Sequence, residues 1–181
     1  GLLIGAGLGV SGALMQLITQ TAWDNLDYLV VDMPPGTGDI QLTLAQKVPV
    51  AGAVIVTTPQ DLALLDAKKG VEMFRKVNIP VLGVVENMAV HICSNCGHAE
   101  HLFGEGGGEK LAAQYGVDLL ASLPLSIAIR LQADDGKPTT IADPESQIAM
   151  IYQELARTVG ARIAQSGQGA QGMPNIVISD D

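Results

Sequence analysis

The feature that most constrains the fold is the stretch DYLVVDMPPGTGD at residues 27–39. Residues 28–31 are apolar and rich in β-branched side chains, a pattern typical of a strand buried on both faces of a parallel sheet. The run ends at the carboxylate of Asp32, and the prolines and glycines that follow stop a strand abruptly. Ligands of open α/β sheets bind at the carboxyl ends of the strands, so Asp32 is placed to hold a metal-bound water beside a phosphate. The alternative is an acidic strand end followed by an ordinary tight turn.

Composition restricts the class of protein. The 181 residues are 48% hydrophobic, which is enough to bury a core, and the net charge is -9 with no basic stripe. Neither nucleic acid nor a membrane is therefore an expected partner, since no apolar run is long enough to span a bilayer. Cys93 and Cys96 are the only cysteines, which argues against a disulfide framework and suits a reducing cytoplasm. The chain begins with Gly1 rather than Met, which suggests a fragment that starts inside a domain.

Apolar runs alternate with helical patterns along the chain. Because a parallel strand pair needs a crossover, this alternation predicts an α/β fold with a doubly wound, mainly parallel sheet flanked by helices. Residues 1–166 are expected to form one domain and residues 167–181, rich in Gly, Gln and Ser, a disordered tail. Besides residues 28–31, the expected strands are 52–57, 80–87 and 119–123, and the expected helices are 13–23, one after Asp39, one from Asp61, 109–115, and one that Asp143 caps and Pro144 begins.

The two cysteines form a C-x-x-C motif in a loop of some fifteen residues. Two thiolates at this spacing can bind one metal centre, but a structural zinc or an iron-sulfur cluster needs about four protein ligands. Only His91, His98 and His101 are near in sequence, whereas a two-fold dimer in which each subunit contributes one pair satisfies the count. A thioredoxin-like redox pair, a zinc at the same dimer site and two thiols without a special role stay open as alternatives.

Three glycine-rich segments bear on phosphate binding. Residues 7–12, GLGVSG, match G-x-G-x-x-G with Asp32 some 20 residues later, which predicts, as the alternative function, an NAD(P)-binding Rossmann oxidoreductase. The strand before this motif is short, and no catalytic pair suited to hydride transfer follows. The P-loop motif G-x-x-x-x-G-K-[ST] is absent, because Gly136-Lys137 is followed by Pro138. Residues 106–108 fit either an anion nest at a helix start or a hinge.

Seven motifs occur in one order: DYLVVDMPPGTGD, TTPQDLALLDAKKG, GVVENM, C-x-x-C-G, FGEGGG, SLPL and DDGKP. In this the chain resembles the Mrp (also called ApbC) iron-sulfur carrier ATPases of the MinD-like P-loop class, from about residue 13 to the last helix. The resemblance implies a homodimeric, cytoplasmic ATPase that binds a [4Fe-4S] cluster between subunits and transfers it to apo iron-sulfur proteins. The N-terminal P-loop portion of that family has no counterpart in the chain, so nucleotide binding is expected of the parent protein.

The same resemblance assigns roles to individual residues. Asp32 is expected to be the catalytic Walker B acid, acting through Mg²⁺ on ATP. Asn87 is expected to hydrogen-bond the adenine edge, with Pro124 against the base. Cys93 and Cys96 are expected to ligate the cluster, although a non-catalytic, zinc-bridged dimer module is a further alternative. The expected nucleotide-sensing switch loop consists of Gly36, Thr37, Gly38 and Asp39.

Overall fold

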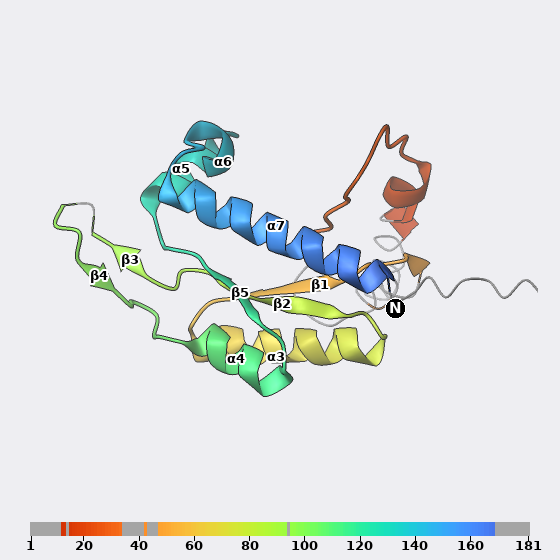
Figure 1. Ribbon diagram of the computed structural model, residues 1–181, viewed down its shortest axis with the longest axis horizontal. Coiled ribbons are helices and arrows are strands. Elements are labelled where there is room, and N and C mark those ends of the chain that lie inside the picture. Colours follow the sequence, from red (N-terminus) through yellow and green to blue (C-terminus); the bar gives the residue numbers. More distant parts are fainter. Residues whose placement is uncertain (1–11, 14, 34–41, 43–46, 94, 169–181) are drawn as a thin grey trace, which may run out of the picture.

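A computed structural model gives the structure of residues 12–13, 15–33, 42, 47–93 and 95–168. Within these residues three parallel strands are ordered β1-β2-β5, and their bounds are β1 (Ala53–Thr57), β2 (Val81–Glu86) and β5 (Leu119–Ser122). The helices α3 (Asp61–Lys76) and α4 (Gly107–Tyr115) cover one face, and α7 (Gln147–Gln168) crosses the other (Figure 1). This is the predicted parallel sheet flanked by helices.

The core lies between the sheet and the helices α3 and α4. Val84 in the central strand β2 is fully buried, and Val71 of α3 and Leu111 of α4 pack in the same cluster. The face that the sequence predicted for α3 is confirmed, because Ala67 is also buried there and Leu64 and Phe74 pack against the cluster. Helical periodicity in α3 and continuous apolar character in β2 thus produce a helix-on-sheet core.

The helix α7 is fastened to the amino ends of the strands. The guanidinium of Arg162 donates to the carbonyl oxygen of Leu82, at 2.6 Å, and to the carboxylate of Asp118. These bonds hold α7 across β2 and β5, on the face opposite α3 and α4 (Figure 1). Arg162 therefore contacts the amino ends of the strands and not their carboxyl ends.

The strand predicted at residues 28–31 is wrong for the described chain. Tyr28, Leu29 and Val30 are irregular in conformation and 62%, 41% and 89% exposed. A strand needs a hydrogen-bonding neighbour. Among the described residues none pairs with this run, and β1 is the edge of the sheet on one side. An apolar run alone therefore does not make a strand.

Several predicted boundaries also change. Residues 12–13 and 15–20 are helical, so the first helix ends before Trp23, and the helix expected after Asp39 lies mostly outside the described residues. The passage after Pro124 holds two short helices, α5 (Ile127–Asp134) and α6 (Thr139–Ala142), which the sequence did not reveal. The predicted cap of α7 is wrong, because Ser146, rather than Asp143, accepts the hydrogen bond from the amide of Ala149, at 3.2 Å.

The chain after α7 is not part of the description. The helix runs to Gln168, two residues into the predicted tail, and residues 169–181 lie outside the described range. Within the described part of the chain, no helix has both the length and the apolar character needed to cross a membrane.

Candidate functional site

Two predicted nucleotide contacts lie at the carboxyl edge of the sheet. Asn87 directly follows β2, and its backbone N–H donates to the carbonyl oxygen of Thr57 at the end of β1, at 2.7 Å. Pro124 follows the end of β5, where the amide of Leu123 donates to the carbonyl oxygen of Glu86, at 2.8 Å. Both residues are half-buried. The strand register therefore places Asn87 and Pro124 at neighbouring strand ends, where open α/β sheets bind ligands.

A hollow opens beside Asn87 along β1. Its cavity volume is about 440 Å³, and its lining includes Asn87, Thr57 and Met33. Met33 is the residue after Asp32, which is exposed. The predicted catalytic acid thus lies one residue from a wall of the hollow that Asn87 borders. The predicted switch residues Gly36, Thr37, Gly38 and Asp39 lie outside the described residues.

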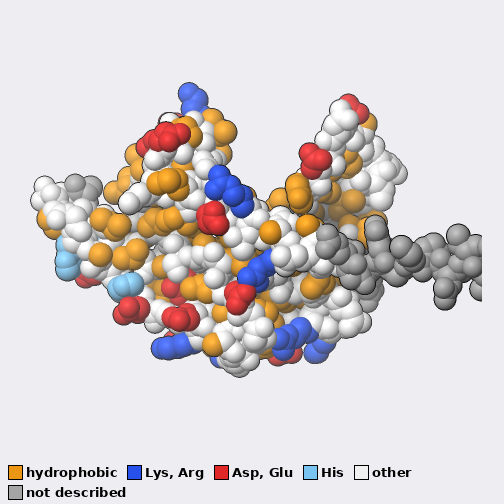
Figure 2. All heavy atoms as spheres, in the orientation of Figure 1, with side chains coloured by type: hydrophobic (Ala, Val, Ile, Leu, Met, Phe, Trp, Pro, Cys, Tyr) orange, Lys and Arg blue, Asp and Glu red, His pale blue; other side chains and the backbone are white. Residues whose placement is uncertain are grey.

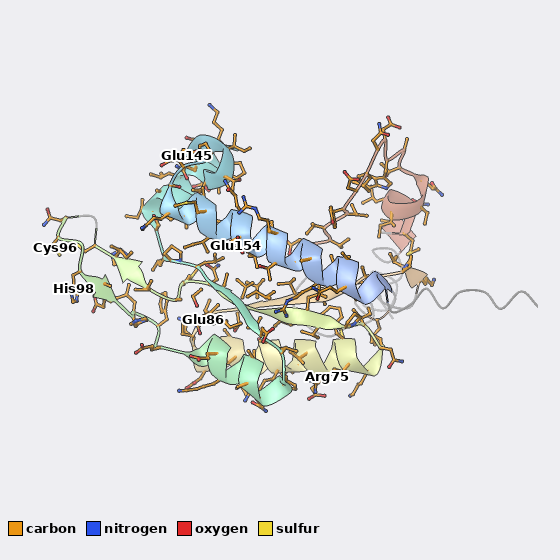
Figure 3. All side chains as sticks on the ribbon, viewed as in Figure 1. Arg75, Glu86, Cys96, His98, Glu145 and Glu154 are labelled. Atoms are coloured by element: carbon orange, nitrogen blue, oxygen red, sulfur yellow. The ribbon has the colours of Figure 1, made fainter. Side chains whose placement is uncertain are left out.

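The cysteines lie on a short β-hairpin. The strands β3 (His91–Ile92) and β4 (Ala99–Glu100) pair antiparallel, and we call residues 91–100 the cysteine hairpin. Its turn is closed by two backbone hydrogen bonds of 2.9 Å, from the amide of Cys93 to His98 O and from the amide of Gly97 to Cys93 O. Cys93 is half-buried and Cys96 is exposed. Figure 3 shows Cys96 and His98 at the end of the molecule, away from the sheet.

The turn of the hairpin stabilises a thiolate. The backbone amide of Asn95 lowers the pKa of the Cys93 thiol most, followed by the backbone amide and the thiol of Cys96, against a smaller opposing effect of burial. Amides that point at the sulfur favour its charged form. The thiolate is the form of cysteine that ligates metals, so the lowered pKa of Cys93 favours the form that a metal would need.

Two of the three nearby histidines are engaged at the base of the hairpin. The Nδ1 atom of His101 lies 2.8 Å from Ala89 O, and the Nδ1 atom of His91 lies 3.3 Å from Leu125 O, where the ring nitrogens can donate to the carbonyls. His98 is exposed near the tip, and Figure 2 shows histidine side chains on this end of the surface. Within the described ranges no group of three or more His, Cys, Asp or Glu side chains can hold a metal ion. The two cysteine sulfurs of one hairpin are half of the four ligands that an iron-sulfur cluster takes.

The glycines of FGEGGG have a structural partner that the sequence analysis missed. The amide of Gly108 donates to the carboxylate of Glu86, which is 4% exposed at the end of β2. A Cβ on Gly108 would lie 2.8 Å from Cβ of Glu86, and one on Gly107 would lie 3.0 Å from Pro59 O. The amide of Gly108 is therefore bound by an internal carboxylate and is not open to an external anion. The available signal was an acid that closes an apolar strand, together with glycines at a helix start.

Known sequences show to which proteins the chain is similar. The profile described as ParA, NUBPL iron-transfer P-loop NTPase, matches residues 3–160. An iron-sulfur cluster carrier protein of Pseudomonas fragi is 86% identical over 151 residues, which are 83% of the chain and 53% of the relative. The carrier protein of Escherichia coli K12 is 61% identical over 158 residues, 87% of the chain and 43% of the relative. An iron-sulfur cluster transfer protein NUBPL of Mus musculus is 51% identical over 164 residues, 91% of the chain and 51% of the relative. The chain thus spans about half the length of these relatives.

Solved structures agree on the fold. A nucleotide-binding protein of Archaeoglobus fulgidus in complex with ADP superposes with a TM-score of 0.65 at 38% identity, over 77% of the chain and 56% of the neighbour. The cell division ATPase MinD of Pyrococcus furiosus superposes with a TM-score of 0.60 at 24% identity, over 83% of the chain and 56% of the neighbour. The predicted MinD-like P-loop class is confirmed. The match to a P-loop family also replaces the dinucleotide-binding oxidoreductase that residues 7–12 suggested.

Proposed function

The chain belongs to the family of NUBPL iron-transfer P-loop NTPases, and we propose that it acts in an ATP-dependent iron-sulfur cluster carrier. In this proposal two copies hold one [4Fe-4S] cluster between their cysteine hairpins and pass it to apo iron-sulfur proteins in the cytoplasm. The names of the relatives at 86% and 61% identity support the cargo. The cluster type, the dimer and the transfer step are our inferences from the residues of the hairpin.

The observation that carries the proposal is the half-site on the cysteine hairpin. Cys93 and Cys96 lie on one turn, and backbone amides stabilise the Cys93 thiolate. A cubane cluster takes four thiolates, and a two-fold axis through the tip doubles a pair into four. The exposed position of Cys96 leaves room both for a second copy and for an acceptor that must reach the cluster. A hairpin tip is therefore suited to a cargo that is delivered rather than kept.

We assign the nucleotide site to the carboxyl edge of the sheet. Asp32 would act through Mg²⁺ as the Walker B acid, and the residues Gly36, Thr37, Gly38 and Asp39 would form the switch loop. Asn87 would hydrogen-bond the adenine and Pro124 would pack against it. The hollow between Met33 and Asn87 supports this assignment, as does the neighbour that was solved with ADP. The P-loop that the family resemblance implies would complete the site from outside this sequence.

Removal of either thiol tests the cluster ligands. We expect Cys93→Ala and Cys96→Ala to abolish the broad visible absorbance after anaerobic reconstitution with iron and sulfide, because each variant leaves two ligands per dimer instead of four. The fold should persist, since both residues lie on an exposed hairpin. His98→Ala is the matched control, and it should retain the absorbance. Cluster assembly in either cysteine variant would refute the ligand assignment, and a colourless wild-type dimer containing zinc would refute the carrier.

The pH dependence of alkylation tests the prepared thiolate. The pKa of Cys93 is lowered in the folded chain, so its thiolate persists as the pH falls below the range in which an ordinary thiol is protonated. We expect iodoacetamide to modify Cys93 of the metal-free protein with a midpoint at lower pH than in the urea-unfolded chain, measured by peptide mass spectrometry. The same midpoint in both states would show that the amides do not stabilise the sulfur.

Cluster release tests the dependence on ATP. The experiment uses the chain extended upstream to the length of its curated relatives, loaded with cluster, and an apo-ferredoxin as acceptor. We expect the release rates with Mg-ATP, with ADP and without nucleotide to differ, and Asp32→Asn to remove the effect of ATP. Equal rates in the three states would overturn the ATP dependence.

A further inference from the structure

The buried carboxylate of Glu86 has no role in the site described so far. It ends the central strand β2, is 4% exposed, and accepts a hydrogen bond from the amide of Gly108 in the first turn of α4. Among the described residues no lysine or arginine forms an ion pair with it. A buried carboxyl group without a cationic partner is costly unless it is hydrogen-bonded, and the amide of Gly108 supplies that bond.

The contact fixes the position of α4 closely. The backbone of Gly107 and Gly108 lies against Pro59 and Glu86 so tightly that a Cβ on Gly108 would be 3.0 Å from the Glu86 Oε2 atom. A Cβ on Gly107 would be 2.8 Å from the Leu64 Cδ1 atom. This close packing fixes the start of α4 against the end of β2 and against the turn before α3.

The cysteine hairpin is joined to the rest of the fold by two segments, which we call its roots. One root leads into the start of α4. Six residues, 101–106, join β4 to α4. The other root leaves β2 through Asn87, and it is held to the β5 side by hydrogen bonds from Ala89 N to Leu123 O, at 2.9 Å, and from Leu125 N to Val90 O, at 2.8 Å. His101 joins the two roots through its contact with Ala89 O. Figure 3 shows Glu86 at the sheet and the hairpin extending from that edge to Cys96.

We propose that Glu86 is a positioning residue that fixes the root of the cysteine hairpin to the strand end carrying Asn87. The inference rests on the proposed function for its consequence, because Asn87 is the proposed base contact. Through Glu86, a displacement of the strand end on nucleotide binding moves the start of α4 and the hairpin root with it. Two consecutive residues thus have the two roles: Glu86 binds the start of α4, and Asn87 is the proposed contact to the nucleotide.

Hydrogen exchange on the chain without nucleotide or metal tests the positioning itself. We expect Glu86→Ala to accelerate exchange in peptides covering residues 101–110 about tenfold, the equivalent of one lost buried hydrogen bond. Glu86→Gln keeps an acceptor oxygen and should stay near wild type. Asp118→Ala is the control, since it removes an acid that binds Arg162 at the other end of the strands. If Glu86→Ala does not fold, Gly108→Ala displaces the same contact from the helix side and should give the same acceleration.

Cluster release then tests the connection to nucleotide. In the extended, cluster-loaded chain, we expect Glu86→Ala to bring the ratio of release rates with and without Mg-ATP towards one, at unchanged cluster loading, and Glu86→Gln to restore it. An unchanged ratio in Glu86→Ala, or an equal loss in Asp118→Ala, would overturn the connection. A wild-type ratio of one would overturn the ATP dependence of the proposed function and the connection together, while the exchange result still decides the positioning. No acceleration of exchange in Glu86→Ala or Gly108→Ala would overturn the positioning role.

Discussion

Two segments of the chain have similar sequences and different structures. Residues 28–32 read YLVVD, and β2 reads VLGVVE, so both are apolar, β-branched runs that end in an acid. β2 is a central strand, paired with β1 and β5 and covered by helices, and its Val84 and Val85 are buried. Residues 28–31 pair with nothing among the described residues, and Tyr28, Leu29 and Val30 expose their side chains. The difference teaches that a hydrogen-bonding neighbour, and not composition alone, converts such a run into a strand.

The terminal acids differ in the same way. Glu86 is buried and accepts a hydrogen bond from the amide of Gly108, so its carboxyl group stabilises the interior of the protein. Asp32 is exposed beside the hollow that Met33 and Asn87 line. An acid that already accepts a hydrogen bond from a helix start is not available for phosphate chemistry, whereas an exposed acid is. The proposed catalytic role of Asp32 is consistent with this difference.

The largest predicted effect contrasts a valine from each run. Val84→Asp buries an unpaired carboxylate in β2 and should cost more than about 4 kcal/mol of unfolding free energy, which abolishes cooperative unfolding. Val30→Asp places the same charge on an exposed side chain and should change stability by less than about 0.5 kcal/mol. Urea denaturation followed by circular dichroism measures both. Comparable losses would show that residues 28–31 are buried as a strand in solution.

An intermediate effect is expected at Gly83 of β2, a glycine that has no counterpart in residues 28–32. A Cβ on Gly83 would lie 2.7 Å from Asp118 O and 2.6 Å from the Leu120 Cγ atom, so Gly83→Ala must push β5 away and should cost about 1–3 kcal/mol. Gly70→Ala in α3 is the control, because its Cβ would meet only the Ile55 Cδ1 atom at 3.8 Å. It should be neutral or stabilising in the same denaturation experiment. An unaffected Gly83→Ala would mean that β2 and β5 are not closely paired.

The smallest effect concerns the place where the exposed run meets α7. A Cβ on Gly160 would lie 3.6 Å from the hydroxyl oxygen of Tyr28, an ordinary contact, so Gly160→Ala should stabilise the helix by about 0.5–1 kcal/mol. Tyr28→Ala should be nearly neutral. The two changes should be additive within about 0.5 kcal/mol, because an exposed run contributes little to α7. A larger coupling energy in the double-mutant cycle would show that Tyr28 is docked.

The sequence predicted those elements in which the apolar residues of the pattern are the residues buried in the fold. The apolar run of β2, the buried face of α3 and the parallel order follow from local pattern together with the need for crossovers. The strand at residues 28–31 failed because its pattern carries no information about a neighbour. The cap of α7 failed because Asp143 and Ser146 are both good capping residues and only the turn between them decides.

The local features of the candidate site could be predicted from the sequence, and one tertiary contact could not. The cysteine spacing is local, so the sequence placed Cys93 and Cys96 on one turn correctly. The juxtaposition of Asn87 and Pro124 at one sheet edge follows from parallel topology. The hydrogen bond between Glu86 and Gly108 joins residues 22 positions apart, and the sequence of neither segment indicates that the two are in contact. Tertiary contacts of this kind require the structure.

The ratio of iron to protein in the reconstituted chain tests the central claim most directly. The protein is reconstituted anaerobically, freed of excess iron, and analysed for iron and sulfide together with its mass by sedimentation. The account predicts about two irons and two sulfides per chain, in a species of twice the 18.8 kDa chain mass that Cys96→Ala fails to load. Four irons on a single chain, or a colourless dimer with one zinc, would contradict a cluster shared between two cysteine hairpins.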